Sequence, residues 1–173
     1  MSRVIALEAD DHVQGPRDAG LVLIEYGDFE CPYCGEEYAE IKAAQQAMGD
    51  ALCFAFRHFP LRQAHPHAER AAEFSEAAAT IGRFWEMHDL LYENQQALDE
   101  RSLTGYARQL GLDEALIQSA MNGDFAARVQ KNFSGGVRNG VNGTPCLFLN
   151  GRRYDGASDT ASLLQLFGEV AAR

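Results

Sequence analysis

Hydrophobic residues near the start of the chain follow first a strand-like and then a helical pattern. Residues 21–26 form a short, almost continuous apolar run, which is typical of a buried strand. From residue 32 to 48 apolar side chains recur at helical spacing, and Gly49 provides a stop. Residues 52–59 are rich in aromatics and are closed by Pro60, which indicates a second strand. A strand, a helix and a strand in this order predict a right-handed crossover unit with parallel strands.

The middle of the chain is patterned differently. It is alanine-rich, and its apolar residues keep a helical spacing that Gly82 and Gly111 interrupt. Ser102 and Asp113 are suitable N-caps for two of the helices, and Asp124 opens another. The pattern therefore predicts a run of several helices.

The last part of the chain returns to strand-like patterning. An apolar run follows Pro145, and Asn150-Gly151 is a strong hairpin signal between two short strands. A helical stripe with Asp159 as its cap ends the chain. We therefore expect an α/β fold with a mixed sheet, in which residues 1–60 and 141–173 form one discontinuous core and residues 61–140 form an inserted helical domain.

Composition and charge narrow the class of protein. Hydrophobic residues make up 46% and charged residues 23%, which is ordinary for a folded domain. A formal net charge of -10 argues against nucleic acid or an anionic membrane as partner. The N-terminus carries acidic residues and no long apolar run, so as written we expect a cytoplasmic protein, or a periplasmic one if a leader has been lost.

Candidate chemistry lies where the first strand meets the first helix. Cys31 and Cys34 are separated by Pro32 and Tyr33, and this spacing lets the two sulfurs meet within one helical turn. At the helix start, unpaired backbone N–H groups and the helix dipole favour a thiolate, so Cys31 is the expected nucleophile. Cys34, one turn further in, is expected to be the resolving thiol. Such a cycle needs no cofactor.

A Cys-x-x-Cys motif is also half of a zinc site. A zinc site needs two more ligands, however, and Cys53 and Cys146 stand alone in apolar strands, while His65 and His67 lack the usual metal spacing. We therefore predict no metal. A metal-binding or adaptor module stays an alternative, and elemental analysis for zinc distinguishes it.

Two further residues belong to the predicted site. Pro145 stands at the start of a predicted interior strand, where a cis Thr144–Pro145 bond facing the cysteines is the expected solution. Glu25 is a carboxylate in an otherwise apolar strand, six residues before Cys31. It is either a desolvated acid with a raised pKa that accepts the Cys34 proton through water, or a residue at a solvated sheet edge.

The segment Tyr-Gly-Asp-Phe-Glu-Cys-Pro-Tyr-Cys-Gly at residues 26–35 resembles the DsbA-like branch of the thioredoxin superfamily, and the resemblance extends over nearly the whole chain. It implies a thioredoxin fold interrupted by helices, with thiol–disulfide oxidoreductase activity. By this resemblance Cys31 attacks, Cys34 resolves, Pro145 is the cis-proline, Thr144 offers a backbone contact to a substrate peptide, and Glu25 matches the buried acid of the family.

Two departures from the family limit what the resemblance implies. Many exported members act as oxidants, whereas the absence of a signal here favours a reductase or thiol-exchange role, with a redox partner protein or glutathione as co-substrate. Cys146 follows the cis-proline where threonine is common, either as core filler or as a third redox thiol. A glutathione-dependent transferase of the same fold is a further alternative, although it would leave Cys34 without a role.

The acidic residues around the motif bear on the reactivity of Cys31. We expect Asp28, Glu30, Glu36 and Glu37 to oppose thiolate formation, with exposure and salt weakening their effect. The prediction is a Cys31 less acidic than the nucleophile of the strongest oxidants.

Overall fold

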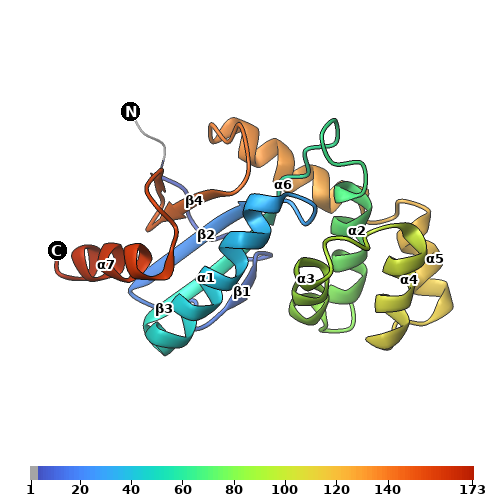
Figure 1. Cartoon of the computed structure of the whole chain (residues 1–173), viewed down its shortest axis with the longest axis horizontal. Coiled ribbons are helices and arrows are strands. Elements are labelled where there is room, and N and C mark those ends of the chain that lie inside the picture. The colour runs from blue at the N-terminus through green and yellow to red at the C-terminus, as the bar shows by residue number, and fades with distance from the viewer. Residues whose placement is uncertain (1–3) are drawn as a thin grey trace.

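The computed structural model describes residues 4–173 and contains a five-stranded sheet with helices packed against it (Figure 1). The strands are β1 (His12–Gln14), β2 (Leu21–Gly27), β3 (Leu52–His58), β4 (Cys146–Leu149) and β5 (Arg152–Tyr154). The helices are α1 (Pro32–Met48), the short 3-10 helix η1 (Gly49–Ala51), α2 (Ala68–Ala79), α3 (Phe84–Glu93), α4 (Glu100–Gln109), α5 (Glu114–Met121), α6 (Ala126–Arg138) and α7 (Thr160–Ala171).

The sheet is mixed, as expected, with the strand order β1-β3-β2-β4-β5. Strands β2 and β3 run parallel, in the register Leu21 opposite Leu52 through Gly27 opposite His58, which confirms the predicted crossover through α1. Strand β4 lies antiparallel on the other side of β2. Strand β1 pairs antiparallel with β3 at the edge of the sheet. The sequence pattern did not reveal β1, because this strand is three residues long and only half-buried. Strand β2, which leads to the cysteines, is therefore central.

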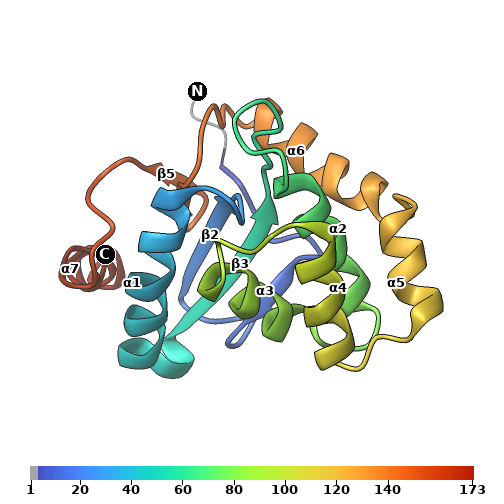
Figure 2. The ribbon, with the colours of Figure 1, turned by 45° about the vertical axis from the view of Figure 1, so that its right-hand side comes forward.

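The two faces of the sheet are covered by different parts of the chain. Alternating residues Leu21 and Leu23 of β2 belong to the larger hydrophobic cluster, together with Leu163 and Phe167 of α7 and residues of α1. Ile24 and Tyr26 point to the other face, into a smaller cluster that Phe133 of α6 joins. Figure 2 shows α1 and α7 on one side of the strands. We call the side under α1 the α1 face.

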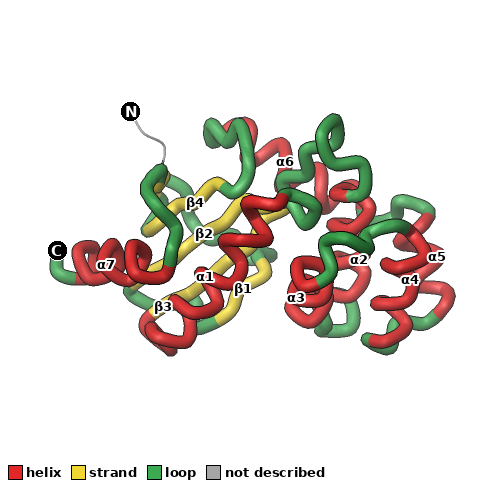
Figure 3. The backbone as a smooth tube through the Cα atoms, viewed as in Figure 1, coloured by secondary structure: helices red, strands yellow, loops and turns green. Residues whose placement is uncertain are grey.

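Helices α2 to α6 lie between β3 and β4 in the chain, and α2 to α5 extend away from the sheet (Figure 3). Their buried side chains, such as Leu103, Ile117 and Val129, belong to the same hydrophobic cluster as the α1 face of the sheet. The helical segment thus shares its core with the strands. Its definition as a separate domain, residues 61–140, stays a prediction.

Two helix starts differ from those expected. Helix α4 begins earlier, because Asp99 is its N-cap and accepts a hydrogen bond from the Ser102 N–H. Helix α6 begins after Phe125, which makes no capping side-chain bond. The Asp113 and Asp159 caps are confirmed. The predicted hairpin is also confirmed, since Asn150 and Gly151 both have positive φ angles, 46° and 78°.

Candidate active site

Cys31 is the N-cap of α1, and Pro32 is the first helical residue. Pro32 suits this position because its missing N–H would be unpaired in any case. The Cys31 side chain lies 3% exposed, whereas Tyr33 is 69% exposed. The Cys31 Sγ lies 3.6 Å from the Thr144 carbonyl oxygen. The nucleophile predicted from the motif therefore sits at the helix tip, at the edge of the surface.

The two cysteines of the motif have opposite acidities. A hydrogen bond from the Cys34 thiol, acting against the effect of burial, lowers the pKa of Cys31 to about 5, and backbone N–H groups of the first helical turn contribute. Burial raises the pKa of Cys34 well above its usual value, since its side chain is fully buried beside the Cys31 thiolate and Glu25. At neutral pH the pair therefore consists of one thiolate and one thiol.

Thr144 and Pro145 lie beside the cysteines, as the sequence predicts. The peptide bond between them is cis, and the Thr144 carbonyl approaches Cys31 from a position 113 residues away in sequence. The Thr144 Oγ1 is buried and has no hydrogen-bond partner among the described residues. The segment before β4 is thus placed against the tip of α1.

Glu25 lies in the central strand and is 3% exposed, so the alternative of a solvated edge position is wrong. It shares the α1 face with Leu23, two residues before it. Burial raises the pKa of Glu25 well above its usual value, and the negative charges of Glu37 and Cys31 add to this. Glu25 is therefore a desolvated acid close to the cysteine pair.

The expectation that exposure weakens the effect of the surrounding acids is wrong for Glu37 and Asp28, since both are buried. Burial raises the pKa of Glu37 to about 7, although a hydrogen bond from Ser158 opposes this. Glu37 lies on the stripe Cys34, Glu37, Ile41 and Ala44, whose spacing of three and four residues was visible in the sequence. It is a second desolvated acid that the motif analysis missed.

Asp28 organises the loop before the nucleophile. Its carboxylate accepts hydrogen bonds from the backbone N–H groups of Glu30 and Leu61, both at 2.8 Å, and contacts the His65 ring at 2.8 Å. The backbone carbonyl of Asp28 accepts a hydrogen bond from the Cys31 N–H at 3.1 Å. These bonds attach the loop after β3 to the loop that carries Cys31. His65, which was considered above only as a metal ligand, belongs to this arrangement.

Gln95, just after α3, also holds the nucleophile loop. Its side-chain amide donates to the Phe29 carbonyl and to the Cys31 carbonyl, both at 2.9 Å. A Cβ atom on Gly35 would lie 2.1 Å from the Gln95 amide oxygen, so only glycine admits this side chain. No sequence signal marked Gln95, because its partners are more than 60 residues away.

The other two cysteines lie on the opposite face of the sheet. Cys146 packs with Tyr26, Phe59 and Phe148 in the smaller cluster, whereas Cys31 and Cys34 belong to the cluster of the α1 face. Burial raises the pKa of Cys146 and also that of Cys53. All four cysteines are free thiols. This placement favours core packing over a third redox thiol for Cys146.

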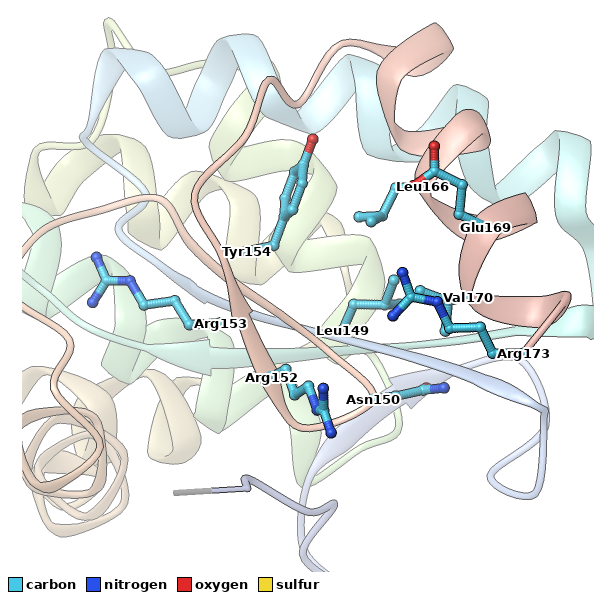
Figure 4. A pocket seen from close by; sticks show the side chains of 9 residues that line it. All are labelled: Leu149, Asn150, Arg152, Arg153, Tyr154, Leu166, Glu169, Val170 and Arg173. Atoms are coloured by element: carbon cyan, nitrogen blue, oxygen red, sulfur yellow. The ribbon is translucent and has the colours of Figure 1, made fainter. Parts of the chain in front are cut away.

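Three further properties of residues 4–173 bear on what the protein can bind. No group of three or more potential metal-ligating side chains occurs in this part of the chain. In the same residues no helix has both the length and the apolar character that crossing a membrane requires. A hollow between the β4–β5 hairpin and α7 is lined by Arg152, Tyr154 and Val170 among others, and by none of the predicted site residues (Figure 4).

A buried dithiol at a helix tip, next to a cis-proline and above a desolvated acid on a mixed sheet, defines a class of thioredoxin-like proteins. The model of the family described as Thioredoxin matches residues 8–167. The chain belongs to the thioredoxin family.

Individual similar proteins agree with this fold. A thioredoxin-like oxidoreductase from Silicibacter pomeroyi is 22% identical, with a TM-score of 0.83 over 96% of this chain and 95% of that one. The structure of α-DsbA1 from Wolbachia pipientis is 15% identical, with a TM-score of 0.85 over 97% and 94%. The predicted thioredoxin fold of the DsbA-like kind is therefore confirmed.

A curated relative from Salinispora arenicola, the Na(+)/H(+) antiporter NhaA 1, is 41% identical over 154 residues. The match covers 88% of this chain and 24% of that protein. The chain thus spans about a quarter of the length of this relative.

Proposed function

We propose that the protein is a thiol–disulfide oxidoreductase that cycles Cys31 and Cys34 between dithiol and disulfide. The observation that carries this proposal is the Cys31–Cys34 pair at the start of α1, with the Cys31 Sγ 3.6 Å from the Thr144 carbonyl beside the cis Pro145 bond; a lowered pKa of Cys31 and a raised pKa of Cys34 support it. A thiolate is the attacking species in disulfide exchange, and the second cysteine stays protonated until the mixed disulfide has formed. Membership of the thioredoxin family supports the same chemistry.

In the first step the Cys31 thiolate attacks one sulfur of a substrate disulfide. A bond forms between Cys31 and that sulfur, the substrate S–S bond breaks, and the other substrate sulfur leaves as a thiolate that takes up a proton from solvent. In the second step Cys34 loses its proton and attacks the Cys31 sulfur. The second substrate thiol is released, and the protein holds a Cys31–Cys34 disulfide. Run backward, the same steps oxidise a dithiol substrate.

Glu25 is the proposed acceptor for the Cys34 proton, through water. Cys34 is fully buried, so its proton has no direct path to solvent, and the Glu25 carboxyl is the acid whose charge raises the pKa of Cys34. Burial raises the pKa of Glu25 above its usual value, which makes its carboxylate a stronger base when it is ionised.

Substrates in this proposal are protein or small-molecule disulfides that contact the surface around the helix tip. Pro32 and Tyr33 are exposed next to Cys31 and offer an apolar contact. The backbone of Thr144, beside the cis bond, is the proposed partner for an extended substrate segment. A redox partner protein, or glutathione, would restore the starting state. The antiporter activity of the longer relatives is not part of this proposal.

The direction of electron flow depends on the potential of the couple and on the compartment. In a reducing cytoplasm a dithiol of ordinary potential stays reduced and acts as a reductase, whereas in a periplasm the same pair works as an oxidant. A Cys31 pKa of about 5 would lie between the values of strongly oxidising and weakly oxidising dithiols.

The experiment that tests the function is the equilibrium of the Cys31–Cys34 couple in glutathione redox buffers, followed by thiol alkylation and mass spectrometry. We expect a reversible two-electron transition with a potential between about -270 and -120 mV. A Cys34→Ser variant should accumulate a mixed disulfide at Cys31 and fail to resolve it. Absence of any interconversion in the wild type, or full turnover by Cys34→Ser, would contradict the proposal.

A further inference from the structure

Tyr92 in α3 lies over the cysteine pair, yet the cycle described above gives it no role. Its ring packs against Phe29 and His88, with ring centroids 5.1 and 5.0 Å away, and stacks on Tyr38 at 5.3 Å. Its hydroxyl is buried and has no hydrogen-bond partner among residues 4–173. Buried hydroxyls are nearly always hydrogen-bonded, because leaving one unpaired costs free energy. The Tyr92 hydroxyl therefore needs an explanation.

Gly27 has no side chain, and this leaves room for the Tyr92 hydroxyl and the Glu25 carboxyl beside its backbone. A Cβ atom at position 27 would lie 2.8 Å from the Glu25 Oε1 and 2.9 Å from the Tyr92 hydroxyl oxygen. The same atom would lie 2.4 Å from a carbon of the Phe56 ring, so any larger residue would collide there. Glycine thus leaves the space beside the two oxygens free of a side chain. The Glu25 Oε1 and the Tyr92 hydroxyl oxygen therefore both lie close to the backbone of Gly27, two residues after Glu25 in β2.

The two groups are complementary in their hydrogen-bonding capacity. Burial raises the pKa of Tyr92 well above its usual value, and the charges of Glu25, Cys34, Asp28 and Cys31 add to this, so Tyr92 stays protonated and can donate. An ionised carboxylate only accepts hydrogen bonds. A hydroxyl that donates to the carboxylate favours its charged form and lowers its pKa.

We propose that the Tyr92 hydroxyl donates a hydrogen bond to the Glu25 carboxylate whenever Glu25 is ionised, and thereby positions Glu25 to accept the Cys34 proton. This inference rests on the proposed function. The proton moves from the Cys34 sulfur to the Glu25 carboxylate, and Tyr92 keeps its own proton throughout. Tyr92 is thus a positioning residue that acts through Glu25.

Several other titratable groups face Glu25, and the test has to separate them. They come from α1 and from α3, and some of them line a narrow cavity beside Glu25. This cavity has about 10 Å³ of space for the centre of a water molecule. These groups are Cys31, Cys34, Glu37, Tyr38 and Lys42 on the α1 side and His88, Asp89 and Tyr92 on α3. Among them, burial raises the pKa of Glu37 to about 7.

The experiment uses Tyr92→Phe, which removes one oxygen and keeps the ring. The reduced protein is mixed in a stopped-flow instrument with a chromogenic aromatic disulfide, and the second coloured thiolate is released when Cys34 resolves the mixed disulfide. We expect the pH midpoint of this second step to rise by about one unit, so that the step slows about tenfold below the midpoint. The attack by Cys31, seen as the first release, should not change.

The matched control is Tyr38→Phe. Tyr38 stacks on Tyr92, but its hydroxyl bonds Glu93 and Lys42, so this variant should leave the midpoint in place. In a Glu37→Gln background the Tyr92→Phe shift should persist, and in a Glu25→Gln background Tyr92→Phe should add nothing. The carboxyl-carbon NMR titration of Glu25 gives a second readout, in which its pKa should rise in Tyr92→Phe.

Two results would overturn the assignment of Tyr92. One is an unmoved midpoint and an unmoved Glu25 titration in Tyr92→Phe; the other is an equal shift in the Glu25→Gln background. A wild-type protein that never releases the second thiolate would overturn the proposed function together with this inference. Normal release with an unmoved midpoint would overturn the inference alone.

Discussion

The buried acids beside the cysteine pair differ from the buried Arg57–Asp11 pair on the other face of the central sheet. On the α1 face, Glu25 and Glu37 are buried acids that form no ion pair with the residues the structure describes. On the other face, the Arg57 guanidinium donates to both carboxylate oxygens of Asp11, at 2.8 and 2.7 Å. Other buried carboxylates have partners as well, since Glu76 contacts the His58 ring at 2.7 Å and Asp28 contacts His65 at 2.8 Å. Paired charges hold the structure together, while unpaired carboxyls acquire raised pKa values and can exchange protons.

The cysteines repeat this contrast. Cys31 and Cys34 lie on the α1 face, where a hydrogen bond from Cys34 and the backbone N–H groups of the helix start lower the pKa of Cys31, while burial and the charge of Glu25 raise that of Cys34. Cys146 lies among aromatic residues on the other face, and burial alone is the largest influence on its pKa. The same side chain is therefore a reactive group on one face and packing material on the other.

The largest effect that tests this comparison is expected from Cys31→Ser. A serine hydroxyl is not ionised at neutral pH, and the remaining Cys34 thiol is buried and protonated. Turnover of a disulfide substrate should fall by about a thousandfold or more. Substrate turnover measured by reductant consumption checks this, and a variant with near-normal turnover would show that another thiol is the nucleophile.

On the opposite face, Arg57→Leu should affect stability and leave the redox potential unchanged. It leaves the Asp11 carboxylate buried without a cationic partner, which should lower the free energy of unfolding by about 3–5 kcal/mol. Denaturant unfolding measures this loss. The double variant Arg57→Leu with Asp11→Leu should recover much of it, because no unpaired charge is left. A loss below about 1 kcal/mol would contradict the structural role of the pair.

Glu37→Gln should stabilise the protein, but only at high pH. Folding raises the pKa of Glu37 from 4.5 to about 7, so the wild type loses stability as the pH rises through this interval. The glutamine variant does not ionise and should therefore exceed the wild type by about 1–3 kcal/mol above the interval, with the difference shrinking below it. Unfolding by denaturant across this pH range measures the difference, and a pH-independent difference would contradict the assignment.

The smallest effect is expected from Cys146→Ala. The change removes one buried sulfur and should lower the free energy of unfolding by about 1 kcal/mol. Turnover should stay within about twofold of the wild type, since the Cys146 side chain belongs to the cluster on the other face of the sheet. Parallel unfolding and turnover measurements check both values. A large loss of turnover at unchanged stability would indicate a third redox thiol.

Local chemistry explains which parts of the site were predictable from the sequence. Cys31, Cys34 and Pro145 are marked by their spacing and by the strands and helix around them, and periodicity located these elements. The burial of Glu37 was also within reach, because it follows Cys34 at helical spacing. Strand β1 was not, since three half-buried residues carry no periodic signal.

Contacts between distant segments account for the rest. The Asp28 carboxylate accepts a hydrogen bond from the loop after β3. The Tyr92 hydroxyl lies near Glu25 because α3 packs over the sheet next to Gly27. A short window of sequence cannot predict these contacts, because they depend on how the helices between β3 and β4 pack. The resemblance of residues 26–35 to a known family pointed to the chemistry but not to these partners.

The side chain of Gln95 ties the redox centre to the helical part of the chain. Its amide binds the carbonyls of Phe29 and Cys31 from the segment that joins α3 to α4. The backbone that carries the nucleophile is therefore fixed on one side by the start of α1 and on the other by a residue that follows α3, so its position depends on how the helical segment packs.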